Sequence, residues 1–219
     1  MAVVTISREF GSEGNSISAK VAEALGYRMI FKKEISEVFE QYGMASFENI
    51  YQADVNFWTQ FDAMRMRMME FLTKVIQAFA HYGNVVIVGR CSYAILAEFT
   101  DVLHVRIQAP LSLRIDRIMQ EGLAVPGEVE DLVKNEDQKR VRLLHTFYNM
   151  PWNQVDMFDL VVNTGKVVPD LAVTWIVEAV KRLEKRSPSK DPTTKTIEVG
   201  PLLEDVVTSA LIASEQAAS

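Results

Sequence analysis

Hydrophobic positions along the chain change repeatedly between a strand pattern and a helical pattern. Short β-branched runs, which are typical of buried strands, occur at Val3–Ile6, Val85–Val88, Val102–Ile107 and Phe158–Asn163. Between them, apolar residues recur at helical spacing and predict helices over residues 17–25, 33–42, 56–82, 92–96, 111–118, 128–148 and 169–183. Strands that alternate with helices predict a parallel sheet with right-handed crossovers, and therefore a three-layer α/β domain with helices on both faces.

The composition changes after Arg186. Residues 187–196 are rich in Ser, Thr, Pro and Lys, which predicts a linker, and Pro201–Ala213 has the pattern of a short amphipathic helix. We therefore expect one domain over residues 1–186 and a linker with a short tail over 187–219.

The overall composition excludes several classes of protein. A chain of 219 residues with 48% hydrophobic and 24% charged residues can bury a sizeable core. Its net charge of −6 argues against a protein whose main partner is a nucleic acid polymer, and no apolar run reaches the length of a membrane span. A single cysteine, Cys91, and the lack of a secretory signal pattern lead us to expect a cytoplasmic protein.

A glycine-bearing loop follows the first predicted strand and precedes a helix. Such a unit directs backbone N–H groups and a helix N-terminus at one point, which suits a phosphate group. Gly14 and Ser16 match the second glycine and the hydroxyl of the P-loop pattern, whereas Glu9 and Asn15 stand at its first glycine and its lysine. A tight strand-to-helix turn without a ligand is the alternative interpretation.

Basic residues occur where an open α/β sheet binds ligands. Arg90 directly follows a predicted parallel strand, and its planar guanidinium suits a monophosphate. Arg114 and Arg117 lie three positions apart on one helix, and they frame a candidate lid together with Lys139, Arg140 and Arg142 beyond the Gly122–Gly127 break. The alternatives are a helix-capping arginine at position 90 and solvated mixed-charge helices in the lid region.

Five stretches in sequence order resemble the cytidylate kinase-like family, which are small P-loop nucleoside monophosphate kinases and their relatives. The stretches are Thr5–Gly14, Lys33–Ile35, Val86–Arg90, Val102–Leu111 with Arg114 and Arg117, and Asp159–Thr164. Together they span about residues 1–183. The resemblance implies a P-loop α/β fold with a helical lid, and transfer of the ATP γ-phosphoryl group to a nucleoside monophosphate such as CMP or dCMP.

The resemblance also implies roles for single residues. The loop would hold ATP, Ser16 would also bind Mg²⁺, and Lys33 and Arg90 would bind the acceptor. Arg114, Arg117 and Arg140 would stabilise charge during transfer. The role of Arg8 is not implied by the resemblance, and we expect Arg8 to supply, from the other side of the loop, the positive charge that Asn15 lacks. The loop residues concerned are Gly11, Ser12, Glu13, Gly14, Asn15 and Ser16.

The chain departs from the family's pattern at several positions. The family usually has a basic residue at Asn15, glycine at Glu13 and, in the classical members, Asp at Cys91, while Lys32 occupies or adjoins the position of another usual Asp. A catalytically degenerate nucleotide-binding or interaction module of the same fold is therefore the rival hypothesis. In that case the predicted helix over residues 56–82, which is rich in methionine (Met64, Met66, Met68 and Met69), or the tail would bind a partner. Either surface could also form a homodimer. A third hypothesis keeps the kinase and changes the acceptor to another small metabolite.

Overall fold

The computed structural model describes residues 1–44, 62–123, 125, 127–186 and 191–218. Its centre is a parallel sheet with the strand order β2-β3-β1-β4-β5. The strands are β1 (Val3–Arg8), β2 (Arg28–Ile30), β3 (Val85–Val88), β4 (Val102–Gln108) and β5 (Leu160–Asn163).

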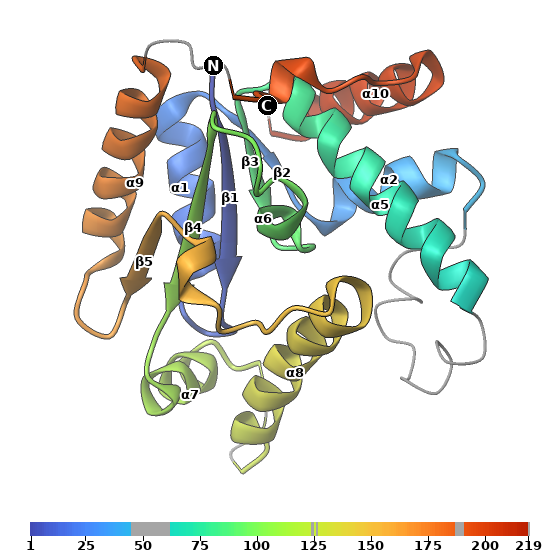
Figure 1. Cartoon of the computed structure of the whole chain (residues 1–219). Coiled ribbons are helices and arrows are strands. Elements are labelled where there is room, and N and C mark those ends of the chain that lie inside the picture. The colour runs from blue at the N-terminus through green and yellow to red at the C-terminus, as the bar shows by residue number, and fades with distance from the viewer. Residues whose placement is uncertain (45–61, 124, 126, 187–190, 219) are drawn as a thin grey trace.

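Helices cover both faces of this sheet, and two more lie beyond the carboxyl ends of the strands (Figure 1). One face carries α1 (Gly14–Leu25) and α9 (Pro169–Glu184), and the other carries α2 (Lys32–Gln41), α5 (Asp62–Tyr82) and α10 (Pro201–Ala218). Beyond the strand ends lie α7 (Leu111–Gln120) and α8 (Val129–Tyr148), while the short helix α6 (Ser92–Ile95) follows β3. Single 3-10 turns occur at Val155–Met157 and Thr194–Thr196.

The central strand β1 shows why the sheet needs helices on both faces. Val3 lies in the core cluster beneath α2 and α5, whereas Val4 and Ile6 lie in the cluster beneath α1 and α9. All three side chains are fully buried, as expected for a parallel strand that is covered on both sides. The predicted three-layer α/β fold of P-loop type, with a parallel sheet and a helical pair at the strand ends, is confirmed.

Some elements differ from the sequence predictions. Strand β2 was not predicted, because it has three residues, pairs only with β3 and buries only Ile30 fully. The predicted helix over 56–82 is confirmed from Asp62 onward, and residues 56–61 lie outside the described part of the chain.

The tail contributes to the main core. Helix α10 packs on α2 and α5, and it buries Leu203, Val207, Ala210 and Leu211 in the same cluster as Phe39 and Phe79. Met68 of the methionine-rich helix is buried in this cluster too. The domain boundary at residue 186 and the homodimer stay predictions. In the described parts of the chain, no helix is both long and apolar enough to cross a membrane.

Because α10 completes a shared core, a cavity within it should destabilise the whole domain. Leu211 is 2% exposed, and we expect Leu211→Ala to lower the free energy of unfolding by about 2–4 kcal/mol in urea titrations. Leu202 on the same helix is 65% exposed, so Leu202→Ala should change the free energy of unfolding by less than about 0.5 kcal/mol. Equal stabilities of the two variants would show that α10 is an independent appendage.

Candidate functional site

A cavity of about 310 Å³ lies at the carboxyl ends of β1 and β3, at the sheet edge where open α/β folds bind ligands. This volume falls in the lower part of the range of small-molecule sites. Four basic side chains line it against one carboxylate, so its surroundings favour an anion. The basic residues are Arg8, Lys32, Arg90 and Arg140, the acid is Glu136, and the apolar lining includes Phe10, Phe31, Tyr93, Leu143, Leu144 and Trp152.

The Arg8 side chain crosses this site from the end of β1. Its Nε donates a hydrogen bond to Oδ1 of Asn15 at 3.0 Å, and its guanidinium lies 5.2 Å from the centre of the Phe31 ring. Two glycines make room for it. A Cβ on Gly14 would lie 2.5 Å from the Arg8 Cβ, and a Cβ on Gly89 would collide with the guanidinium. Arg8 therefore brings a positive charge to the position at which Asn15 lacks one.

The loop between β1 and α1 is held by an ion pair with α7. Gly11 and Glu13 have positive φ values of 76° and 62°. The Glu13 carboxylate lies 2.7 Å from a nitrogen of Arg117, which also donates hydrogen bonds to the Gly11 carbonyl and to both the side chain and the carbonyl of Thr164. Arg117 thus joins the loop to the end of β5 and neutralises the acid that stands where the family usually has glycine.

Asp137 of α8 connects the lid helices to the same loop. Its carboxylate lies 2.6 Å from Arg114 of α7 and 3.1 Å from Arg140, and it accepts a hydrogen bond from the Phe10 N–H at 2.9 Å. The Asp137 and Arg114 side chains are only 13% and 9% exposed. Arg114 also donates to the carbonyls of Phe10 and Ala109. The two arginines on Asp137 differ in position, because Arg140 lines the cavity while Arg114 is buried behind the loop.

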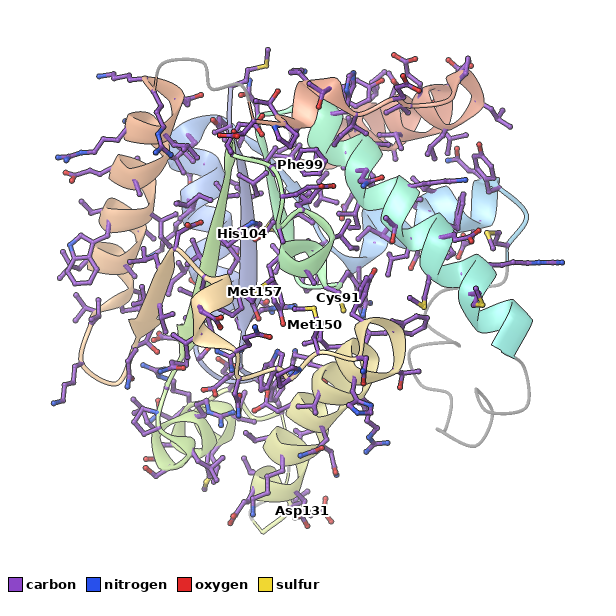
Figure 2. The ribbon with its side chains drawn as sticks, in the orientation of Figure 1. Cys91, Phe99, His104, Asp131, Met150 and Met157 are labelled. Carbon is purple, nitrogen blue, oxygen red and sulfur yellow. The ribbon has the colours of Figure 1, made fainter. Side chains whose placement is uncertain are left out.

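A left-handed turn after β3 sets Arg90 beside the cavity. Gly89, Arg90 and Cys91 all have positive φ values, between 55° and 76°. Non-glycine residues pay on the order of 1–3 kcal/mol each for this conformation, and such strain is concentrated at functional sites. Figure 2 shows Cys91 at the carboxyl end of β3, where burial raises the pKa of its thiol to about 12. The thiol is therefore a packing group and stays protonated at neutral pH.

The structure brings together four of the predicted site residues, namely Arg8, Asn15, Arg90 and Arg140. It places the others elsewhere. Lys33 is exposed and lies 3.8 Å from Glu37, and Ser16 is exposed in the first turn of α1. Arg114 and Arg117 hold the loop through their ion pairs. The remaining predicted residues form the backbone of the loop itself, namely Gly11, Ser12, Glu13 and Gly14. Their catalytic and binding roles stay predictions.

Sequence reasoning missed residues that line the cavity and one that holds its wall. Lys32, not its neighbour Lys33, lines the cavity. Arg106 was missed because it lies inside an apolar strand. The signal in the sequence was the arginine itself within that strand, since it is 3% exposed in the structure and a buried arginine needs partners. It donates a hydrogen bond to the Trp152 carbonyl at 3.0 Å, and its guanidinium lies 4.2 Å from the centre of the Trp152 ring. Arg106 thereby fixes the aromatic wall of the cavity, while burial lowers the pKa of its guanidinium.

The described side chains form no cluster of three or more His, Cys, Asp or Glu residues that could hold a metal ion on their own. His104 lies within the sheet (Figure 2), where its Nδ1 is 2.7 Å from the Thr5 hydroxyl, and burial lowers the pKa of its imidazole. His104 is therefore a hydrogen-bonded core histidine.

Comparison with known proteins identifies the family. The sequence profile of the cytidylate kinase-like family matches residues 3–166, which contain the whole sheet, the loop and both lid helices. The chain belongs to the cytidylate kinase-like family. The predicted membership is confirmed, and the match includes all the residues that line the cavity.

Curated and solved relatives agree with this assignment. The chain is 27% identical to the cytidylate kinase of Ignicoccus hospitalis over 84% of its length and 99% of that protein. It is 28% identical to the cytidylate kinase of Pyrococcus horikoshii over 83% of its length and 90% of that protein. A crystal structure of an uncharacterised protein from Eubacterium ventriosum shares the fold, with a TM-score of 0.62, 22% identity and coverage of 83% and 99% of the two chains. The two cytidylate kinases and the family membership support an enzyme of the kinase class.

Because Asp137 pairs with two arginines, we predict that this member of the cytidylate kinase-like family loses stability when the Asp137 carboxylate is neutralised. Asp137→Asn would leave Arg114 buried opposite a neutral group, so we expect the free energy of unfolding to fall by about 2–3 kcal/mol in urea titrations. Asp131→Asn is the matched control, because Asp131 is exposed on the same helix and lies toward its far end (Figure 2). Similar stabilities of the two variants would contradict a structural role for Asp137.

Proposed function

We propose that this protein transfers the γ-phosphoryl group of ATP to a nucleoside monophosphate, with CMP or dCMP as the acceptor. The observation that carries the proposal is the cavity at the carboxyl edge of the sheet, where Arg8, Lys32, Arg90 and Arg140 surround a space beside the glycine loop. Membership of the cytidylate kinase-like family supports the kinase class, and the relatives' names support the cytidine acceptor.

The glycine loop is the site for the donor phosphates. Gly11 and Glu13 take left-handed conformations immediately before α1 begins at Gly14, so backbone N–H groups and the helix N-terminus converge there. The acids of the loop are neutralised internally, since Glu13 pairs with Arg117 and Glu9 lies 3.5 Å from Arg114. The loop therefore holds its shape before ATP arrives and presents little net negative charge to it.

The basic side chains of the cavity surround the reacting groups. An oxygen of the acceptor phosphate attacks the γ-phosphorus of ATP and forms a new P–O bond. The bond between the γ-phosphorus and the β–γ bridging oxygen breaks at the same time. The products are ADP and a nucleoside diphosphate. Arg90 and Lys32 hold the acceptor phosphate, and Arg8 and Arg140 stabilise the charge on the transferred group. A planar guanidinium can contact two phosphate oxygens at once, which fixes the acceptor's orientation.

Magnesium is expected with ATP, and the residues present fit a site that is built mainly by the nucleotide. Mg²⁺ commonly uses one or two protein ligands together with phosphate oxygens and water, so the exposed Ser16 hydroxyl in the first turn of α1 is a sufficient protein ligand. Bound Mg²⁺ would neutralise charge on the β- and γ-phosphates.

The direct test is ATP consumption by the purified chain with CMP, dCMP, UMP and AMP, each with and without Mg²⁺. We expect Mg²⁺-dependent formation of ADP with CMP or dCMP as the best acceptor, because the named relatives of this chain are cytidylate kinases. Turnover that prefers another acceptor would change the assigned substrate. A protein that consumes no ATP and whose melting temperature does not respond to millimolar ATP or CMP would contradict the proposal.

A catalytically degenerate module of the same fold is the second candidate. Two observations favour it. The loop lacks the P-loop lysine, and all three lid arginines are engaged in ion pairs, Arg114 and Arg140 with Asp137 and Arg117 with Glu13. Such a module would keep nucleotide binding and lose transfer, and the Arg8 and Asn15 variants separate the two candidates.

If Arg8 supplies the charge that the lysine supplies elsewhere, Arg8→Ala should lower kcat by about 100-fold or more. Asn15→Lys should change kcat little, because the charge next to position 15 is already present. A degenerate module would be inactive as wild type and in both variants. Activity that appears only in Asn15→Lys would show that the geometry is intact and that Arg8 does not replace the lysine.

A further inference from the structure

Tyr93 is a buried polar residue in the cavity that the mechanism above does not use. It lies in α6, directly after the strained turn at Arg90 and Cys91, and it is 4% exposed. Its ring packs against the Phe158 ring with centres 4.6 Å apart. Its hydroxyl is buried and has no hydrogen-bond partner among the described residues.

This arrangement is unfavourable for the free protein. A buried hydroxyl without a partner loses the hydrogen bonds that it makes to water in the unfolded chain. Native proteins pair most buried polar groups, and the exceptions require an explanation. Phenylalanine would fill the same space without this penalty. The burial that raises the pKa of the Tyr93 phenol also keeps it protonated, and therefore able to donate a hydrogen bond.

The lining of the cavity indicates which part of an acceptor would meet Tyr93. The acceptor's phosphate has Arg90 and Lys32 to bind, and charge-assisted hydrogen bonds are stronger than bonds to a neutral hydroxyl. The remaining lining is mainly apolar and aromatic, and it includes Leu143, Leu144 and Trp152. A planar base with a polar edge suits these surfaces, since the aromatic ring offers a stacking face and Tyr93 offers a single polar atom.

We propose that the Tyr93 hydroxyl is a specificity-determining contact that forms a hydrogen bond with the base of the acceptor. This inference rests on the proposed function, because it assigns a partner within the same cavity. A site that buries a polar group for its ligand discriminates against ligands that leave the group unpaired. Arg106 supports the site from behind, since it holds Trp152 through a hydrogen bond and a cation–π contact.

The test compares a ligand that has a base with one that lacks it. Dissociation constants are measured by calorimetry for ribose 5-phosphate and for the monophosphate that wild type binds best among CMP, dCMP, UMP and AMP. We expect Tyr93→Phe to weaken binding of that nucleotide by roughly 3- to 10-fold and to leave binding of ribose 5-phosphate unchanged. Without ligand, Tyr93→Phe should be as stable as wild type or more stable in urea titrations.

Tyr148→Phe is the matched control. The Tyr148 hydroxyl lies 3.4 Å from that of Thr73, and Tyr148 is not among the residues that line the cavity, so this variant should keep the wild-type ratio of the two dissociation constants. Three outcomes would overturn the proposal. Tyr93→Phe could bind the nucleotide as tightly as wild type does, or its binding of both ligands could be weakened equally. It could also be less stable than wild type, which would show that the hydroxyl has a structural partner such as water. If wild type binds none of the four nucleotides, the proposed function fails with it, whereas the first three outcomes leave that function intact.

Discussion

The space around the Arg8 side chain is the constraint on which the site depends. Arg8 ends the central strand, and its path between the loop and the β3 turn exists only because Gly14 and Gly89 have no side chains. The guanidinium then reaches Asn15 at the start of α1 and lies over Phe31 at the start of α2. One cation thus touches the segments that follow β1, β2 and β3, and it links the loop to the cavity. The pairing with Asn15 gives a physical reason for a loop without lysine, since a second cation there would be repelled.

Carboxylates hold the arginines of the two lid helices in place. Arg114 and Arg117 each meet an acid at 2.6–2.7 Å and donate to loop carbonyls, so their charges are used within the protein. Arg140 shares Asp137 with Arg114 and still lines the cavity, together with Arg8 and Arg90. A carboxylate that pairs two arginines restrains both, because removal of the shared charge would leave two cations close together. The loop is therefore held in place from outside by the lid helices.

The Gly89–Cys91 turn illustrates how the fold holds an unfavourable conformation. Two consecutive residues with side chains take positive φ values there, and the packing around them must offset the cost. Cys91 and Tyr93 are buried in the core cluster on that face of the sheet, so the turn is fixed by the same apolar contacts that hold α5 and α10. The partnerless Tyr93 hydroxyl is a second local cost at the same place. Unfavourable groups concentrated beside a basic cavity are typical of a site that was selected for a ligand and not for stability.

The sequence by itself determined the layers of this protein and the order of its main elements. The hydrophobic pattern of a strand depends only on neighbouring residues, so Val3–Ile6 and Val85–Val88 were recognisable as buried strands. The position of Arg90 directly after a strand placed it at the sheet edge that carries the cavity. Strand β2 was not predicted, because three residues with one buried side chain show almost no hydrophobic pattern. The partners of the arginines were also beyond sequence reasoning. Only the tertiary structure decided that Asp137 would meet Arg114, that Arg8 would reach Asn15 and that Tyr93 would have no partner, because these contacts depend on distances between segments that are far apart or turned by strained loops.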